Sequence, residues 1–114
     1  MEREEVVIVS GVRTPFDTFG GVMRSTDTVT LGSFVVKEAM RRAQVDPADV
    51  EETYIGINMP TQNRSIARQI ALTAGMPPES NSTTVDRACC SSMVAIEMAK
   101  RAIEVGDAKI TVGG

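Results

Sequence analysis

The chain alternates short, β-branched apolar runs with longer segments in which apolar residues recur every three or four positions. The short runs have the length of strands and lie at 6–9, 52–57, 82–85 and 109–112. The longer segments have helical periodicity and lie at 31–44, 65–74 and 91–105. Residues 13–27 contain Pro15 without apolar periodicity, which predicts a loop. Strands that alternate with helices predict an α/β fold, with a mostly parallel sheet flanked by helices.

The burial of these elements can also be predicted from their patterns. The run at 6–9 is continuous rather than alternating, so we expect a strand buried on both faces and central in the sheet. The strand at 109–112 is expected to leave an open edge. Gly75 stands where a left-handed C-cap would end the second helix. The apolar stripes expected to be buried are Leu31, Phe34, Val35, Ala39 and Ala43; Ile66, Ala67, Ile70, Ala71 and Ala74; and Ala95, Ile96, Ala99 and Ile103.

Composition narrows the classes of function. The 114 residues suffice for one domain or part of one, and 12 basic against 15 acidic residues argue against a polyanion-binding surface. Histidine is absent, so an imidazole base would have to come from outside this chain. The acidic N-terminus and the short apolar run after it do not fit an export signal or a membrane span. Because the two cysteines are adjacent and cannot staple distant segments, we expect a reducing, cytoplasmic setting.

Those cysteines, Cys89 and Cys90, lie among small residues at the predicted junction between the third strand and the third helix. A thiol at a helix N-terminus is close to unpaired backbone N–H groups and to the positive end of the helix dipole, which favour the thiolate. The same donors can stabilise an oxyanion when the sulfur attacks a carbonyl. The alternative is that both cysteines are small buried hydrophobic residues.

Several short motifs occur in a collinear order along the chain. They are the segment V-I-V-S-G-V-R-T-P-F at 7–16, Gly20-Gly21, Asn63 with Ala67-Arg68-Gln69 and Leu72, the segment 86–92, and Gly106-Asp107-Ala108 with Gly113-Gly114. In this order and spacing the chain resembles the N-terminal part of a thiolase of the acetyl-CoA acetyltransferase family. The resemblance implies that residues 1–114 form an incomplete N-terminal thiolase half-domain, without the loop domain and the C-terminal half.

The resemblance also implies a chemistry. Cys89 matches the family's nucleophile, which forms a Cys-linked acyl-enzyme in the reversible Claisen condensation of acyl-CoA or the thiolysis of 3-ketoacyl-CoA. No metal or cofactor is implied beyond coenzyme A thioesters as substrates. The missing half would supply a histidine and a second, acid–base cysteine. Cys90 is interpreted as a packing residue, and Arg13 and Arg68 as loop and helix anchors.

Two questions stay open from the sequence. The chain is either the small subunit of a split thiolase, completed by a larger thiolase-like chain in a heteromeric dimer of dimers, or a fragment of one. The reaction is either that of a thiolase or that of a β-ketoacyl synthase-like condensing enzyme, or the chain is a non-catalytic thiolase-fold scaffold. Three residues depart from the family pattern, namely Asp86 for Asn, Ala88 for a bulkier residue and Ser92 for Gly, and the scaffold alternative rests on Asp86 and Ser92. Asp86 would place a negative charge near the thiol, which opposes the thiolate.

Overall fold

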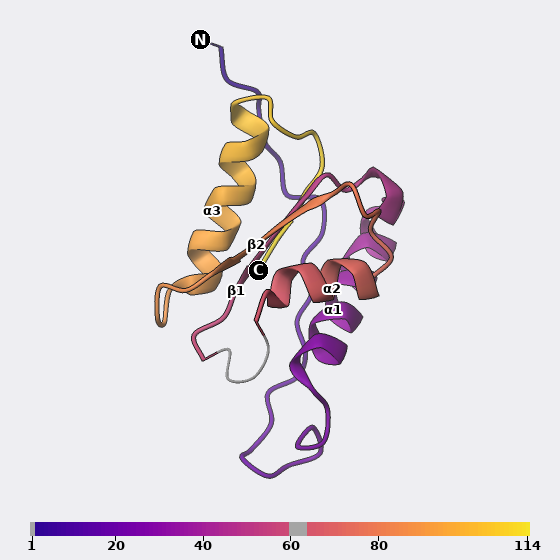
Figure 1. Cartoon of the computed structure of the whole chain (residues 1–114), viewed down its shortest axis with the longest axis vertical. Helices are drawn as coiled ribbons and strands as arrows, with labels where there is room; N and C mark the ends of the chain where they lie inside the picture. Colours follow the sequence, from indigo (N-terminus) through magenta and orange to yellow (C-terminus); the bar gives the residue numbers. More distant parts are fainter. Residues whose placement is uncertain (1, 60–63) are drawn as a thin grey trace.

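The computed structural model describes residues 2–59 and 64–114, and it contains three strands and three α-helices in alternation (Figure 1). Pro60, the predicted exit of the second strand, and Asn63 of the thiolase pattern lie outside the described residues. The elements in chain order are α1 (Thr28–Ala43), the 3₁₀ turn η1 (Pro47–Asp49), β1 (Glu52–Gly56), α2 (Ile66–Thr73), β2 (Asn81–Val85), α3 (Ser91–Glu104) and β3 (Thr111–Gly113).

The three strands form one parallel sheet in the order β2-β1-β3, which confirms the predicted α/β class. Thr53 at the centre of β1 pairs with Ser82 of β2 on one side and with Val112 of β3 on the other. Helix α3 covers one face of the sheet, while α2 covers the other face and α1 packs against α2 (Figure 1). Helices on both faces are what buried parallel strands require.

Side chains of β1 alternate between the two helical layers. The Thr53 hydroxyl donates to the Met76 sulfur at 3.0 Å, and Ile55 and Ile57 pack against the same apolar cluster below α1 and α2. Gly56, which has the opposite parity, faces the start of α3. This period of two is that of a pleated strand.

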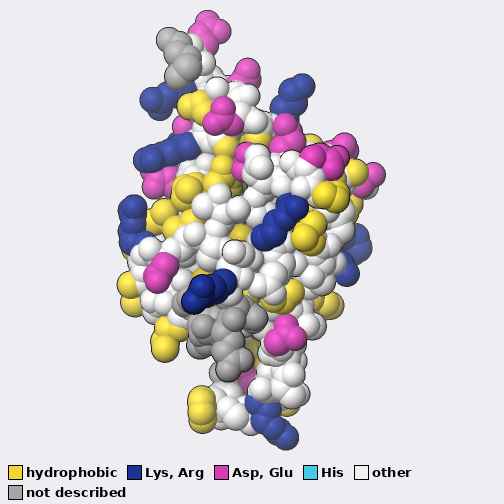
Figure 2. Space-filling model, viewed as in Figure 1, with side chains coloured by type: hydrophobic (Ala, Val, Ile, Leu, Met, Phe, Trp, Pro, Cys, Tyr) yellow, Lys and Arg dark blue, Asp and Glu magenta, His cyan; other side chains and the backbone are white. Residues whose placement is uncertain are grey.

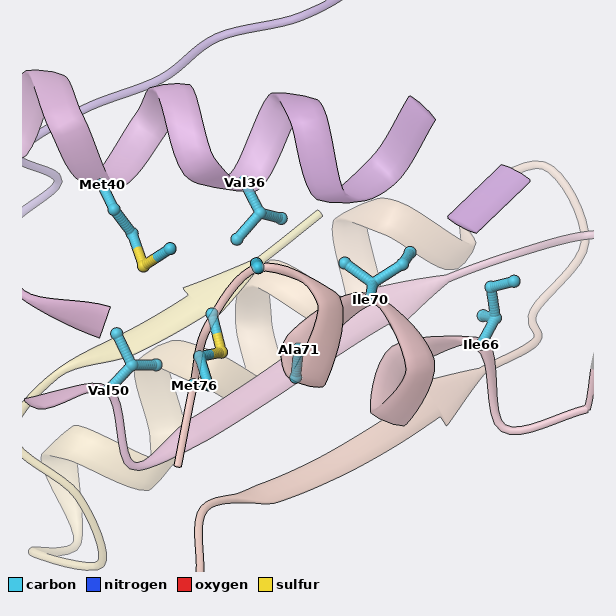
Figure 3. Close-up of a cluster of buried hydrophobic side chains, with 8 residues drawn as sticks. Val36, Met40, Val50, Ile66, Ile70, Ala71 and Met76 are labelled. Carbon is cyan, nitrogen blue, oxygen red and sulfur yellow. The ribbon is translucent and has the colours of Figure 1, made fainter. Parts of the chain in front are cut away.

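The main core lies between α1, α2 and the sheet. In Figure 3, Val36 and Met40 of α1 point toward Ile70 and Ala71 of α2 and toward Met76. The stripe predicted for α2 is buried at every position, so this prediction is confirmed. The cluster comprises Val36, Met40, Val50, Ile66, Ile70, Ala71, Ala74 and Met76.

The helix ends follow local sequence. The Asp27 carboxylate accepts a hydrogen bond from the Thr30 N–H at 2.7 Å and caps α1, whose C-cap Gln44 has a left-handed backbone. Gly75 has a φ of +95°, and the following Met76 N–H donates to the Ala71 carbonyl at 3.0 Å. The predicted left-handed C-cap of the second helix is therefore confirmed.

The expectation of a central strand at 6–9 is wrong. Residues 2–10 form no helix or strand, and the Ile8 side chain is 84% exposed. The physical reason is that β2 and β3 occupy both sides of β1, so no central place remains. An extended segment without a neighbouring strand leaves its backbone groups to water.

Two predicted helical stripes also need correction. Phe34 of α1 is 69% exposed because α1 contacts α2 through the row that contains Gly32, Val36 and Met40; a Cβ at Gly32 would lie 2.4 Å from the Ile70 Cδ1. Ile96 of α3 is 42% exposed, because α3 lies so close to the sheet that its small side chains make the contact. The buried residues of α3 are Ser91, Ala95, Ala99 and Ala102.

The predicted loop before α1 is confirmed, since residues 11–26 form no helix or strand. This loop extends beyond the helices in Figure 1 and exposes the apolar side chains of Phe16, Phe19 and Val22. Acidic and basic side chains are interspersed on the face shown in Figure 2. No helix in the described part of the chain is both long and apolar enough to cross a bilayer.

Candidate functional site

The candidate site is the tight turn that joins β2 to α3. Five residues separate Val85, the last of β2, from Ser91, the first of α3. At the middle of this turn Ala88 has a φ of +48°, a left-handed conformation that is unfavourable for a residue with a Cβ. The Asp86 carboxylate accepts a hydrogen bond from the Ala88 N–H at 3.0 Å and so stabilises the turn.

The hydroxyl of Ser91 closes the same turn from below. Its Oγ accepts a hydrogen bond from the Arg87 N–H at 2.7 Å and donates one to the Ala88 carbonyl at 2.7 Å. Backbone bonds reinforce the closure, because the Cys90 N–H donates to the Arg87 carbonyl and the Ser91 N–H to the Ala88 carbonyl, both at 3.2 Å. Hydrogen bonds at Arg87, Ala88 and Cys90 therefore hold the turn on both sides of Cys89.

Gly56 of β1 sets how close this turn lies to the sheet. A Cβ at Gly56 would lie 2.4 Å from the Ser91 carbonyl carbon and 2.4 Å from the Ser92 nitrogen. Because both are backbone atoms, they could not move aside without shifting the start of α3. The absence of a side chain at position 56 thus allows the N-terminus of α3 to rest directly on β1.

Cys89 is exposed and lies one residue before Cys90, the N-cap of α3. Within residues 2–59 and 64–114, no acceptor is recorded for the N–H group of Cys89. Such N–H groups at a helix start carry a partial positive charge. An exposed thiol on the same residue as such an N–H group is suited to attack a carbonyl, because the N–H group can stabilise the developing oxyanion.

The alternative of two buried cysteines is wrong, since both are exposed and both are free thiols. Cys90 is therefore not a packing residue as interpreted from the resemblance. Its Sγ donates to the Arg87 carbonyl at 3.1 Å and is engaged in the turn, whereas no partner is recorded among the described residues for the sulfur of Cys89. Of the two adjacent thiols, that of Cys89 is therefore more available for reaction than that of Cys90.

The other candidate residues have structural contacts. Arg68 of α2 donates to the carbonyls of Ser80 and Pro78 at 2.7 and 2.8 Å, which ties α2 to the segment before β2. Arg13 lies over the Phe16 ring at 4.7 Å within the N-terminal loop. Both contacts agree with the interpretation of these arginines as anchors, and neither brings its guanidinium to Cys89.

Two residues of this site were not recognised in the sequence, Gly56 and Ser91. A glycine inside a β-branched run is a sign of close backbone approach, and this sign was available at position 56. A serine at the start of a helix commonly bonds to nearby backbone groups. The sequence does not say which of the neighbours Ser91 and Ser92 makes such bonds, because that depends on which one faces the turn.

The fold and this turn together define a class of protein: part of an α/β domain that presents an exposed thiol at a strand-to-helix junction. The family model for the thiolase N-terminal domain matches residues 6–114. The chain belongs to the thiolase family, and the resemblance seen in its motifs is confirmed.

Individual relatives agree with this assignment. An acetyl-CoA acetyltransferase of Schizosaccharomyces pombe is 41% identical over 100% of this chain and 29% of its own length. A 3-ketoacyl-CoA thiolase of Aliivibrio fischeri is 44% identical over 97% of this chain and 30% of its own length. The crystal structure of the Acat5 thiolase from Ascaris suum in complex with coenzyme A superposes with a TM-score of 0.91 at 38% identity, over 93% of this chain and 28% of that one. The chain therefore spans less than a third of the length of these proteins.

Proposed function

We propose that this chain is the nucleophile-bearing part of an acyl-CoA C-acetyltransferase and that Cys89 is its nucleophile. The observation that carries the proposal is that Cys89 is exposed on a closed turn just before α3, with a backbone N–H for which no acceptor is recorded among the described residues. Membership of the thiolase family supports acyl-CoA as the class of substrate. Cys90 is a weaker candidate because its thiol is bonded to the Arg87 carbonyl.

The reaction divides into two transfers at one sulfur. The Cys89 thiolate attacks the carbonyl of an acyl-CoA, and the tetrahedral intermediate collapses to an S-acyl cysteine as the coenzyme A thiolate leaves. The α-carbanion of a second acetyl-CoA then attacks this thioester, which releases 3-ketoacyl-CoA and regenerates the Cys89 thiolate. In this proposal the Cys89 N–H serves one oxyanion hole, together with a backbone donor from the partner chain. Thiolysis is the same sequence in reverse.

The proton transfers of this scheme require groups from outside the chain. The sequence has no histidine to accept the thiol proton, and no second site cysteine remains because Cys90 lies in the same turn. We propose that a larger thiolase-like polypeptide supplies both groups, together with the loop domain and the C-terminal half, in a cytoplasmic heteromeric assembly of two or four copies. The short share of each relative that this chain covers supports a missing part.

Trapping of the acyl group tests the assignment of the nucleophile. The natural assembly is incubated with labelled acetyl-CoA, quenched in acid and digested, and the modified residue is located by mass spectrometry. We expect the label on Cys89, and Cys89→Ser should lower turnover at least about a thousandfold. Cys90→Ser is the matched control and should keep most of the activity, because its thiol is hydrogen-bonded within the turn to the Arg87 carbonyl.

The other outcomes point to the alternatives. Acyl transfer from acyl carrier protein but not from free acyl-CoA would indicate a β-ketoacyl synthase-like enzyme. An assembly in which Cys89 takes up neither the acetyl group nor iodoacetamide would indicate a scaffold. Purification of the native protein addresses the proposed partner, because a large chain should copurify with the small one in a fixed ratio.

A further inference from the structure

We propose that Ser91 is a positioning residue, whose hydroxyl holds Ala88 in its left-handed conformation and thereby aims Cys89 for acyl transfer. The proposal rests on the proposed role of Cys89 as the nucleophile. It assigns to Ser91 a function in the reaction without contact with the substrate.

The hydrogen bonds of Ser91 bracket the strained residue. The Oγ accepts from the N–H of Arg87, which precedes Ala88, and donates to the carbonyl of Ala88 itself, both at 2.7 Å. These two bonds hold the peptide group before Arg87 and the peptide group after Ala88, so they span Ala88, whose φ of +48° costs free energy for an alanine. The hydroxyl therefore offsets a conformation that the sequence does not favour at this position.

The burial of Ser91 increases the cost of losing these two hydrogen bonds. Ser91 is 4% exposed, whereas Cys89 and Ser92 on the same turn are exposed. With alanine at position 91, the Arg87 N–H would lose its acceptor at a part-buried site. Gly56 of β1 lies directly against the Ser91 backbone, so α3 cannot move closer to β1 to compensate for the lost hydrogen bonds.

The conformation of Ala88 determines where the thiol of Cys89 lies. Cys89 is joined directly to Ala88, so a rotation of Ala88 away from the left-handed region swings the Cys89 backbone and its thiol. A displacement of about 1 Å can slow a positioned reaction by roughly a hundredfold. Ser91 itself is buried beneath the turn, which predicts a loss in the rate of acylation rather than in the affinity for acyl-CoA.

The test compares Ser91→Ala with Ser92→Ala in the natural assembly. Single-turnover acylation by acetyl-CoA gives the rate at saturation and the concentration at half-maximal rate. For Ser91→Ala we expect the saturating rate to fall about tenfold or more, while the half-maximal concentration changes less than about twofold. Ser92→Ala, which removes an exposed hydroxyl without a recorded bond in the described part of the chain, should behave as the native protein.

A rescue separates positioning from general stabilisation. Glycine adopts positive φ readily, so Ala88→Gly should restore part of the acylation rate when combined with Ser91→Ala. If Ser91→Ala does not fold, Ser91→Cys keeps the size and weakens the bonds, and it should show a smaller loss of the same kind. A native saturating rate in Ser91→Ala or in Ser91→Cys would overturn the proposal, as would an equal loss in Ser92→Ala or no rescue by glycine. Failure to acylate Cys89 in the unaltered protein would instead refute the nucleophile itself.

Discussion

Single residues decide how the reactive turn meets the sheet. Cys89 projects from a turn whose backbone is strained at Ala88 and tied down by Asp86 and Ser91. Gly56 is distant from this turn in the sequence, but in the folded chain it lies directly against the start of α3. The geometry of the thiol therefore depends on a residue without any side chain.

Substitution of Gly56 by alanine should disturb both folding and chemistry. The new methyl group would overlap the Ser91 and Ser92 backbone, and such overpacking costs about 1–3 kcal/mol. We expect a lower free energy of unfolding in denaturant titrations and slower acylation of Cys89. Gly11→Ala is the control, since a Cβ there meets no described atom within 4 Å, and it should stay within about 0.5 kcal/mol. Native acylation and stability in Gly56→Ala would contradict this account.

At the same scale, the sequence located the reactive residue but not its surroundings. The small residues around Cys89 and the predicted helix after it were sufficient to place a thiol at a helix start. Whether Cys89 and Cys90 are exposed or buried was left open, because exposure depends on what packs over the turn. The engagement of the Cys90 thiol with the Arg87 carbonyl was likewise visible only in the folded chain.

Among the elements, α1 shows how local charge stabilises a helix. Arg41 and Arg42 hydrogen-bond the Glu38 carboxylate one turn before them and lower its pKa from 4.5 to about 2. The Thr30 N–H at the other end of the helix lowers the pKa of the capping Asp27. Ionisation of both carboxyl groups is therefore more favourable in the folded state than in the unfolded chain.

Removal of one of these charges should change the free energy of unfolding in a pH-dependent way. A lowered pKa in the folded state stabilises the fold above the unfolded value of 4.5, and this contribution is lost as the pH falls toward 2. We expect Glu38→Gln to lower the free energy of unfolding slightly at pH 7 and to match the native protein near pH 2, as measured by denaturant titrations across this range. The matched control for the change of charge is Glu79→Gln, because Glu79 is exposed and has no recorded ion pair among the described residues. A difference for Glu38→Gln that is constant with pH would contradict the ion-pair explanation.

Element positions were more predictable than the faces that they bury. Periodicity, Pro47 and Gly75 placed the helices to within a few residues, because caps and breakers act locally. The buried face of α1 was mispredicted because its contact row is set by the close approach of Gly32 to Ile70 of another helix. α2, which is covered by α1 and lies on the sheet, buries the whole stripe that its sequence shows.

The molecule as a whole carries more exposed apolar surface than scattered single residues would explain. Val7, Ile8 and Val9 are at least 67% exposed in the extended N-terminal segment, and Phe16 and Phe19 are exposed in the loop that follows. Large contiguous apolar surfaces are typical of contact sites with other protein. We propose that the remaining part of a thiolase packs over these exposed apolar side chains.

Separation of the chain from the rest of the protein should therefore change its behaviour. Expressed alone, the 114 residues should aggregate or fold only partly, and the amides of residues 6–9 should exchange with solvent within seconds. Expressed together with the polypeptide that carries the remaining part, the chain should be recovered in a complex in which these amides are strongly protected. Hydrogen-exchange mass spectrometry of both samples measures the difference, and a stable, monodisperse monomer of the chain alone would contradict it.

By itself the sequence determined the α/β class, the approximate ends of the three helices and of three of the four predicted strands, the family, and the candidate nucleophile, because these depend on local periodicity, helix caps and motif order. Only the tertiary structure decided that residues 6–9 have no place beside β1, that Cys89 is exposed while Cys90 is bonded, and that Ser91 rather than Ser92 closes the turn. The physical reason is that burial, strand order and hydrogen-bond choice are properties of contacts between distant segments, and a local pattern does not specify which partner a residue meets.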